Sequence, residues 1–312
     1  MSATRVLVLG ASGMLGSMLA DYLSRDAGLE VTATVRSPEY LDRGRRLIPD
    51  IRWTVLDAGE PGAPDGPSVI DGQDWVVNAI GIVKPLIRDD NPLEIERAIR
   101  VNSLWPHELA KLARRAGARV IQIATDCVYS GVKGRYAEQD AHDPTDVYGK
   151  TKSLGEVRAP EVYHLRCSII GPEPREHRSL LGWFLSQKPG ASVPGYVNHR
   201  WNGLTTLHFA KICRGIIGGK ASLAGLRHVI PADDVTKFEL LGLFGAHFRR
   251  QDVVIDPREA GVVIDRTLVT EDAEANATLW RAAGHESPPT VADMVAELAA
   301  YDYRLGNLAS AP

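Results

Sequence analysis

Short, almost uninterrupted apolar runs alternate with amphipathic segments of helical period along most of the chain. The first run, Thr4 to Leu9 (TRVLVL), is followed at once by a helical pattern from Met14 to Leu23. Strands without regular polar alternation are typical of a parallel sheet that is covered on both faces. Further strands are expected at residues 29–35, 51–56, 74–80, 119–124, 161–166, 227–231 and 253–256. The alternation of strands and helices predicts an α/β protein with a doubly wound parallel sheet.

The other long helical patterns are amphipathic and lie between these strands or after them. They cover residues 92–116, 203–218, 234–248 and 291–301. Asp233 or Asp234 is expected to cap the third of these helices, because a short carboxylate side chain can accept from the free amides of the first turn. We expect the remaining residues, up to the last, to be mainly helical.

A glycine-rich turn, GASGMLG, links the first strand to the first helix. Its three glycines allow a tight turn, a close approach of the backbone to a pyrophosphate, and close packing of helix on strand. The amino end of the helix then faces the phosphates. Strand, turn and helix in this order predict a Rossmann-type dinucleotide site, with contacts from Gly10, Ser12, Gly13, Met14, Leu15 and Gly16.

The end of the second strand indicates which dinucleotide is bound. An NAD site usually has an acidic residue there to hold the ribose hydroxyls, whereas a cation suits the 2′-phosphate of NADP. This chain has Arg36 at that position. We therefore expect NADP (as NADPH) to be favoured over NAD.

The stretch from Arg119 to Glu156 contains the candidate catalytic groups. Its strand ends at Thr125, and Tyr148 and Lys152 follow four residues apart in a segment with helical character. On a helix, these two side chains lie next to each other on one face. A nearby ammonium favours the phenolate, so the pair can exchange a proton with a carbonyl oxygen near neutral pH, and Thr125 can add a hydroxyl to the same oxygen.

Composition excludes several classes of protein. The chain is 44% hydrophobic and 24% charged, and its formal net charge of −3 gives no reason to expect nucleic acid or an anionic membrane as a partner. No segment reaches the ~20 apolar residues of a membrane span, and no basic leader precedes the first strand. The three cysteines are widely spaced, which indicates reduced thiols in a cytoplasmic protein and no metal site.

Two motifs in the central stretch carry a family resemblance. The segments TDCVYSG and VYGKTKSLGE resemble signatures of the extended short-chain dehydrogenase/reductase superfamily, and most closely its dTDP-4-dehydrorhamnose reductase branch. The resemblance begins at Val6, is dense between Ala124 and Glu156, and continues more thinly to about Met294.

The resemblance implies further site residues. Cofactor contacts would come from Asp57, Ala58, Asn78, Ala79, Ile80, Gly81 and Asn102, with Tyr148 and Lys152 also touching the cofactor. Asn102 would act mainly as a support for the catalytic strand. Residues 173–203 are rich in Arg, His, Pro and Trp, which suits a nucleoside diphosphate, although an ordinary basic loop remains an alternative. Substrate contacts are assigned to Lys84, Asp126, Cys127, Arg175, Arg200 and Asn202.

The resemblance also implies how the chain is divided. After the strand that ends at Arg166, the chain leaves the cofactor domain to build a substrate lobe. Residues 1–166 and 204–252 then form the Rossmann domain. Residues 167–203 and 253–312 form a smaller C-terminal α+β lobe, covered by the last helices.

These features predict an NADPH-dependent reductase of a keto group, at carbon 4, on a nucleotide-linked deoxysugar. Sugar-nucleotide dehydratases of the same superfamily have Asp-Glu after the threonine, whereas this chain has Asp126 and Cys127, so dehydration is not expected. An NAD-dependent sugar-nucleotide epimerase remains open, because it uses the same Tyr and Lys. A non-catalytic NADP-binding regulatory subunit is a third hypothesis, and homodimer formation is left open.

Overall fold

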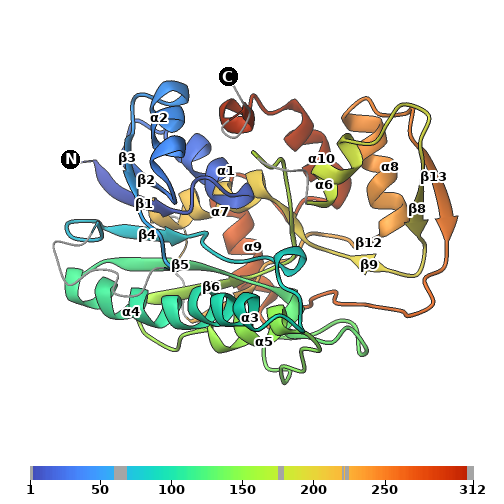
Figure 1. Ribbon diagram of the computed structural model, residues 1–312, viewed down its shortest axis with the longest axis horizontal. Coiled ribbons are helices and arrows are strands. Elements are labelled where there is room, and N and C mark those ends of the chain that lie inside the picture. Colours follow the sequence, from blue (N-terminus) through green and yellow to red (C-terminus); the bar gives the residue numbers. More distant parts are fainter. Residues whose placement is uncertain (1–2, 60–68, 175–178, 220, 222–224, 308–312) are drawn as a thin grey trace.

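Seven parallel strands form the central sheet of the computed structural model, which describes residues 3–59, 69–174, 179–219, 221 and 225–307. Their order across the sheet is β11-β6-β5-β4-β1-β2-β3 (Figure 1). The doubly wound parallel α/β sheet predicted from the apolar runs is thus confirmed, with small changes at the strand ends. The strands are β1 (Thr4–Leu9), β2 (Leu29–Val35), β3 (Arg52–Val55), β4 (Trp75–Asn78), β5 (Arg119–Ala124), β6 (Val162–Arg166) and β11 (Leu226–His228).

The strand order reverses between β1 and β4, which lie side by side at the middle of the sheet. Leu9, the last residue of β1, pairs with Asn78, the last residue of β4. In an open α/β sheet, the loops that follow two such strands lead away in opposite directions and leave a crevice at their carboxyl ends. The glycine-rich turn follows β1 at this crevice.

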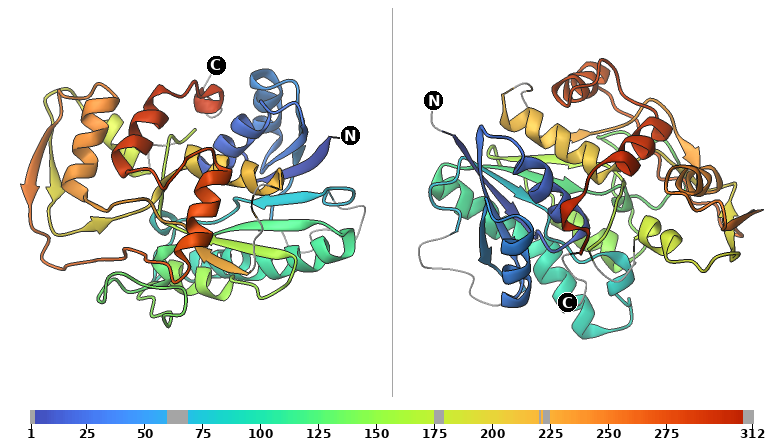
Figure 2. Two further views of the ribbon diagram at one scale, coloured as in Figure 1. Left: turned by 180° about the vertical axis from the view of Figure 1, so that it is seen from behind. Right: turned by 90° about the horizontal axis from the view of Figure 1, so that it is seen from above.

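Helices cover both faces of the sheet (Figures 1 and 2). On one face lie α1 (Met14–Leu23) and α7 (Thr206–Ile217), and on the other lie α4 (Trp105–Ala116) and α5 (Val147–Leu154). Strand β1 serves both layers: Val6 and Val8 join one apolar core, and Leu7 and Leu9 join the other. All four are fully buried, which explains why β1 has no polar alternation.

The segment predicted as one helix from 92 to 116 is interrupted. It consists of α3 (Pro92–Ala98), a π-helical stretch η2 (Ile99–Leu104) and α4. Pro106 has no amide hydrogen and cannot donate to the carbonyl of Asn102, so the regular helical ladder cannot continue through this point. That carbonyl approaches Gly155, where an added Cβ would lie 2.0 Å from the oxygen. The interruption therefore lies where the helix meets the end of α5.

The predicted cap of the helix at 234–248 is wrong. This helix, α8, covers Lys237–His247, and Thr236 caps it in a reciprocal capping box with Glu239. Asp233 instead accepts from the amide of Val291 at 2.7 Å, and Asp234 forms an ion pair with an arginine. Both aspartates lie before the true first turn, and tertiary contacts occupy them.

The described part of the lobe contains short two-stranded pairs and the helices α6 and α8. Strands β8 (Ser192–Tyr196) and β13 (Val254–Arg258) pair in parallel, and β9 (Arg200–Trp201) pairs with β12 (Val235–Thr236). Helices α6 (Leu180–Leu185) and α8 pack together, and α8 also packs on β8 and β13 (Figure 1). Strands β7 (Ile169–Ile170) and β10 (Leu204–Thr205) form a third pair at the passage between the two parts.

The last helices connect the lobe to the sheet. Helix α9 (Ala273–Ala282) packs on α7, and α10 (Val291–Ala300) packs on α8 and β10. Beyond α10 the chain returns to α1, where the Tyr303 hydroxyl donates to Ser17 and Arg304 pairs with Asp21, both at 2.5 Å. We therefore propose to count α8 with the lobe and residues 301–307 with the sheet domain, in place of the predicted division.

Every described helix is too short or too polar to cross a membrane.

Candidate active site

The turn after β1 requires glycine at two positions. Gly10 has a φ of +81°, in the left-handed region that favours glycine. At Gly16, an added Cβ would lie 2.2 Å from the carbonyl oxygen of Gly10, so helix α1 approaches the turn as closely as backbone atoms allow. Two of the three predicted glycine roles, the tight turn and the close packing of helix on strand, therefore have a direct geometric reason.

The amino end of α1 has the properties of an anion site. Gly13 caps the helix without a side chain, it is exposed, and the first turn contains no acidic residue. The free amides and the positive end of the helix dipole thus face outward beside Gly13. Ser12 and Leu15 are buried behind this point, and Met14 is half-buried.

Arg36 and Asp57 lie at the ends of neighbouring strands, β2 and β3. Arg36 is exposed, and no described residue forms an ion pair or side-chain hydrogen bond with it. Asp57 is half-buried and accepts from the amide of Gly59 at 2.8 Å, while Ala58 is buried. The guanidinium of Arg36 is therefore available for a phosphate.

The segment after β4 is shaped by two buried amide side chains. Asn78 donates to the side-chain oxygen of Gln122 at 2.7 Å and accepts from the amide of Ile80 at 3.2 Å. Its polar atoms thus hold the turn through Ala79, Ile80 and Gly81. Gly81 itself is exposed, and an added Cβ there would lie in ordinary contact with Asn102.

Asn102 joins this segment to the helix that bears the candidate catalytic residues. Its oxygen accepts from the amide of Ile82 at 2.8 Å, and its nitrogen donates to the carbonyl of Ile82 at 2.9 Å and to the hydroxyl of Thr151 at 3.2 Å. Ser103 donates to the Thr151 carbonyl at 2.8 Å. Through these bonds the π-helical stretch fixes α5 beside the segment that follows β4.

Thr125 and Tyr148 meet at the carboxyl end of β5. Thr125 follows the strand and accepts from the amide of Cys127 at 3.2 Å, and Tyr148 lies in the first turn of α5, which Asp146 caps. Burial raises the pKa of Tyr148, and the hydroxyl of Thr125 offsets part of that rise. The phenol is therefore protonated at neutral pH and lies beside the predicted second hydroxyl.

Lys152 lies one helical turn after Tyr148, and its ammonium donates to the carbonyl of Ile123 in β5 at 3.1 Å. Burial lowers the pKa of Lys152 to about 8. The phenol of Tyr148 has a raised pKa, opposite in direction to the lowering that we expected from this lysine. The free protein thus favours a proton-donating phenol over a phenolate.

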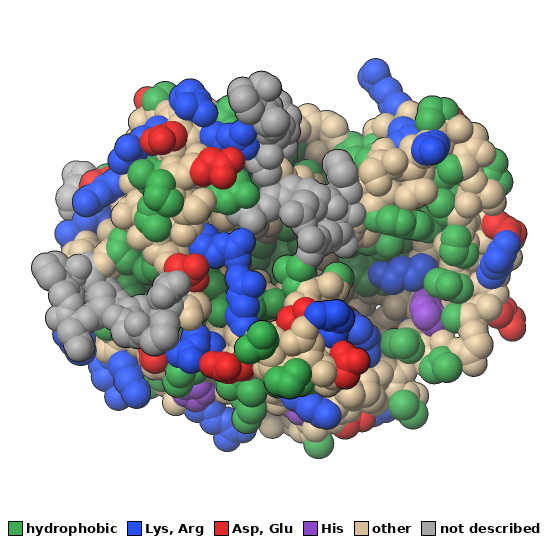
Figure 3. All heavy atoms as spheres, viewed as in Figure 1, with side chains coloured by type: hydrophobic (Ala, Val, Ile, Leu, Met, Phe, Trp, Pro, Cys, Tyr) green, Lys and Arg blue, Asp and Glu red, His purple; other side chains and the backbone are tan. Residues whose placement is uncertain are grey.

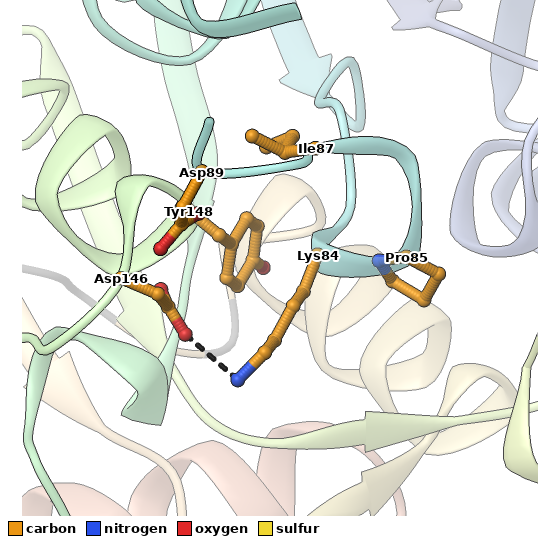
Figure 4. Close-up of a pocket in the computed structure, with 6 residues that line it drawn as sticks. All are labelled: Lys84, Pro85, Ile87, Asp89, Asp146 and Tyr148. Carbon is orange, nitrogen blue, oxygen red and sulfur yellow. Dashed lines mark ion pairs between the residues drawn. The ribbon is translucent and has the colours of Figure 1, made fainter. Parts of the chain in front are cut away.

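A cleft of about 560 Å³ opens beside Tyr148 (Figure 4). The short helix η1 (Lys84–Leu86) forms one wall, and the start of α5 forms the other. Lys84 reaches across to Asp146 at 2.8 Å, and Asp89 accepts from the amide of Val147 at 3.3 Å. Lys84, one of the predicted substrate residues, therefore lies at the cleft.

The other predicted substrate residues fall into two groups. Asp126 and Cys127 follow Thr125, and burial raises the pKa of both side chains, that of Cys127 to about 12. Arg200 is ion-paired with Asp234. The side chain of Asn202 donates to the carbonyl of Leu268 and accepts from the amide of the same residue. Arg200 and Asn202 thus have partners within the lobe, and Arg175 lies outside the described residues.

Two cations that the sequence analysis did not single out face the same site. Lys237 and Arg266 both act electrostatically on Asp126 and Cys127. No motif marks them. One available signal was a lysine at the start of a helix, where the helix dipole disfavours a cation. Lys237 is the first residue of α8.

The sequence model of one protein family, described as the RmlD substrate binding domain, matches residues 4–170. Among curated proteins, a dTDP-4-dehydrorhamnose reductase of Streptomyces griseus is 36% identical over 159 residues, 51% of this chain and 45% of that protein. The match thus spans less than half of the reductase's own length. The methionine adenosyltransferase 2 subunit beta of Bos taurus is 33% identical over 248 residues, 76% of this chain and 70% of that protein.

A solved structure of dTDP-4-dehydrorhamnose reductase from Bacillus anthracis, in complex with NADP, superimposes with a TM-score of 0.66. The superposition covers 95% of this chain and 98% of that one at 16% identity. A likeness at this identity establishes a common fold across the sheet domain and the lobe.

Proposed function

Because the chain belongs to the RmlD substrate binding domain family, we propose that it is an NADPH-dependent reductase of a keto group on a nucleotide-linked sugar. The proposed substrate class follows the name of the dTDP-4-dehydrorhamnose reductases. It is a nucleotide-linked deoxysugar, whose keto group at carbon 4 is reduced. The observation that carries the proposal is the meeting of Thr125 and Tyr148, with Lys152 one turn away, at the sheet edge that the glycine turn borders.

The residues at that edge fit NADP. Gly13 leaves the amino end of α1 open for a pyrophosphate. A side chain at Gly16 would collide with the backbone of the glycine turn. Arg36 offers a guanidinium that no described residue pairs with, where the 2′-phosphate of NADP is expected. The NADP bound by the Bacillus anthracis reductase supports the same choice. When bound, the nicotinamide supplies the hydride.

The side chains of this chain then supply the proton and hold the carbonyl. The raised pKa of Tyr148 keeps its phenol protonated until negative charge develops on the carbonyl oxygen, to which it donates. The Thr125 hydroxyl hydrogen-bonds the same oxygen and stabilises that charge. Lys152, tied to Ile123, places a positive charge behind the phenol and favours the phenolate that remains.

A second candidate function is a regulatory subunit that binds NADP without turnover. It is favoured by the extent of the match to the bovine methionine adenosyltransferase 2 subunit beta, which runs over 248 residues. The intact set of Thr125, Tyr148 and Lys152 argues against it, because binding alone does not require a proton donor beside a second hydroxyl.

One assay separates the candidates. Purified protein is incubated with NADPH and a panel of 4-keto sugar nucleotides, and nicotinamide absorbance and sugar products are followed together. A reductase consumes one NADPH for each product. An epimerase forms product without net oxidation, and a regulatory subunit binds NADPH without either change. If the protein binds NADPH but forms no product from any sugar nucleotide of the panel, the reductase proposal is contradicted.

A further inference from the structure

Two cations from the second half of the chain converge on the residues next to Thr125. Lys237 begins α8, and Arg266 lies in the segment between β13 and α9. Both favour ionisation of Asp126, the residue that follows Thr125 directly. Figure 3 shows this face of the molecule hollowed between the sheet domain and the lobe, with basic side chains at the hollow. The lobe thus brings positive charge to the reacting end of the site.

The ammonium of Lys237 has no hydrogen-bond or ion-pair partner among the described residues. The backbone amide of Lys237 donates to the carbonyl of His199 at 2.9 Å. Its ammonium lies over the ring of Trp201, whose centroid is 5.5 Å from Nζ. Burial lowers the pKa of this lysine to about 8.

The guanidinium of Arg266 has a hydrogen-bond partner for only one of its nitrogens among the described residues. Its Nε donates to the carbonyl of Tyr129 at 2.7 Å, and its two terminal nitrogens have no hydrogen-bond or ion-pair partner among the described residues. The bond to Tyr129 orients the guanidinium, and the outer edge of the guanidinium remains free. A free edge of this kind suits a carboxylate or phosphate group, which can accept two parallel hydrogen bonds.

The nearby carboxylates balance only part of the charge of the two cations. Burial raises the pKa of Asp126, and Arg266 and Lys237 offset part of that rise. Asp143 accepts from the amide and hydroxyl of Ser130, and Asp146 is paired with Lys84. Two cations therefore share the carboxylate of Asp126, and an anionic ligand would supply the remaining counter-charge.

We propose that Lys237 and Arg266 form a subsite for an anionic group of the substrate, in the site that Tyr148 and Thr125 border. The group offers carboxylate or phosphate oxygens. It is either a carboxylate on the sugar ring or the diphosphate that links sugar to nucleoside. The inference rests on the proposed sugar-nucleotide site, within which it assigns the residues that recognise the substrate's charge.

The test is a set of calorimetric titrations of the NADP-loaded protein. The probes are UDP-glucose, UDP-glucuronic acid, dTDP-glucose, dTDP-glucuronic acid, UDP, dTDP and inorganic pyrophosphate. The variants are Lys237→Met, Arg266→Gln and the charge-preserving Lys237→Arg. Lys188→Met, which removes an exposed lysine of the lobe, serves as the matched control. Circular dichroism and thermal melting check that each variant is folded.

We expect Lys237→Met and Arg266→Gln to weaken binding at least tenfold, with Lys237→Arg and Lys188→Met close to the parent. A loss confined to the glucuronic acid probes identifies a sugar carboxylate. An equal loss for all probes, pyrophosphate included, identifies the diphosphate. The proposal is overturned if folded Lys237→Met and Arg266→Gln bind every probe within twofold of the parent, or if the parent binds none of them.

Failure of the reductase proposal has a different signature. If the parent never oxidises NADPH with any keto sugar nucleotide but the variants still lose anion binding tenfold, the subsite stands and the reaction is wrong. If the parent reduces a keto sugar nucleotide and the variants bind and react like it, the reaction stands and the subsite is wrong.

Discussion

The Nζ atom of Lys84 lies 2.8 Å from a carboxylate oxygen of Asp146, across the cleft beside Tyr148. The other oxygen of Asp146 caps α5 by accepting from the amide of Gly149 at 2.8 Å. Burial opposes ionisation of Asp146, but the amide of Gly149 and the ammonium of Lys84 together lower its pKa. One carboxylate thus connects the wall of the cleft to the helix that holds the phenol.

Replacing Asp146 by Ala removes both the cap and the ion pair. We expect a loss of about 1 kcal/mol in the free energy of unfolding from the cap, while the half-exposed ion pair contributes less. Asp146→Asn keeps the cap acceptor and is the matched control. Urea denaturation of both variants measures the difference, and equal stability of the two would contradict the assigned cap.

Replacing Tyr148 by Phe removes the proton donor but keeps the ring. We expect keto reduction to fall by about 10²-fold to 10⁴-fold, the usual contribution of a positioned acid. The affinity for NADPH should stay within about threefold, because the glycine turn and Arg36 hold the phosphates. Steady-state kinetics and NADPH titration check both expectations. Turnover at the parental rate would remove Tyr148 from the mechanism.

Replacing Arg36 by Glu should invert the preference between the two dinucleotides. The variant places a carboxylate where the 2′-phosphate is expected, so NADPH binding should weaken by about tenfold or more. NADH binding should hold or improve, since a carboxylate can accept from ribose hydroxyls. Arg46→Glu, a nearby change of the same charge, is the control. Unchanged NADPH affinity in Arg36→Glu would show that Arg36 does not contact the phosphate.

The stability of the protein should fall as the solution becomes acidic, and His228 is one cause. Burial, together with the Arg166 guanidinium at 2.9 Å, lowers the pKa of His228 from 6.5 to about 4. The unfolded chain takes up this proton at a higher pH than the folded one. The stabilisation is therefore complete above about pH 6.5 and is lost as the pH falls toward 4, by up to about 3 kcal/mol.

The variant His228→Asn tests this contribution, because Asn keeps a donor for the Val269 carbonyl but carries no charge at any pH. Urea denaturation of parent and variant is measured at pH 7 and at pH 4.5. The variant should lose less stability between these two values than the parent does. An equal loss in both would assign the acid sensitivity to other groups.

Much of the architecture could be predicted from short-range pattern. Val6, Leu7, Val8 and Leu9 form an apolar run because both faces of the sheet are covered, and that requirement is visible in the residues themselves. The first helix begins at Met14 and ends at Leu23, as its period predicts. The glycine turn could be predicted for the same reason. Gly10 and Gly16 are required by the backbone geometry of a segment of seven residues.

Only part of the candidate site could be predicted from the sequence. Tyr148 and Lys152 are one helical turn apart, so their neighbourhood follows from local spacing, and Thr125 follows from the end of a strand. The direction of the Tyr148 pKa did not follow, because it depends on burial by the folded chain. Arg200 and Asn202 were chosen by motif, but their partners lie elsewhere in the lobe.

The sequence by itself determined the order of the main strands and helices, the glycine-rich turn and the spacing of Tyr148 and Lys152, because each depends on residues close together along the chain. Only the tertiary structure decided that Lys237 and Arg266 face Asp126, that Lys84 pairs with Asp146, and that Asn102 bridges Ile82 and Thr151. These contacts join residues separated by tens of positions or more. Their free energy arises only when the packing of the core brings distant segments together, which no local periodicity records.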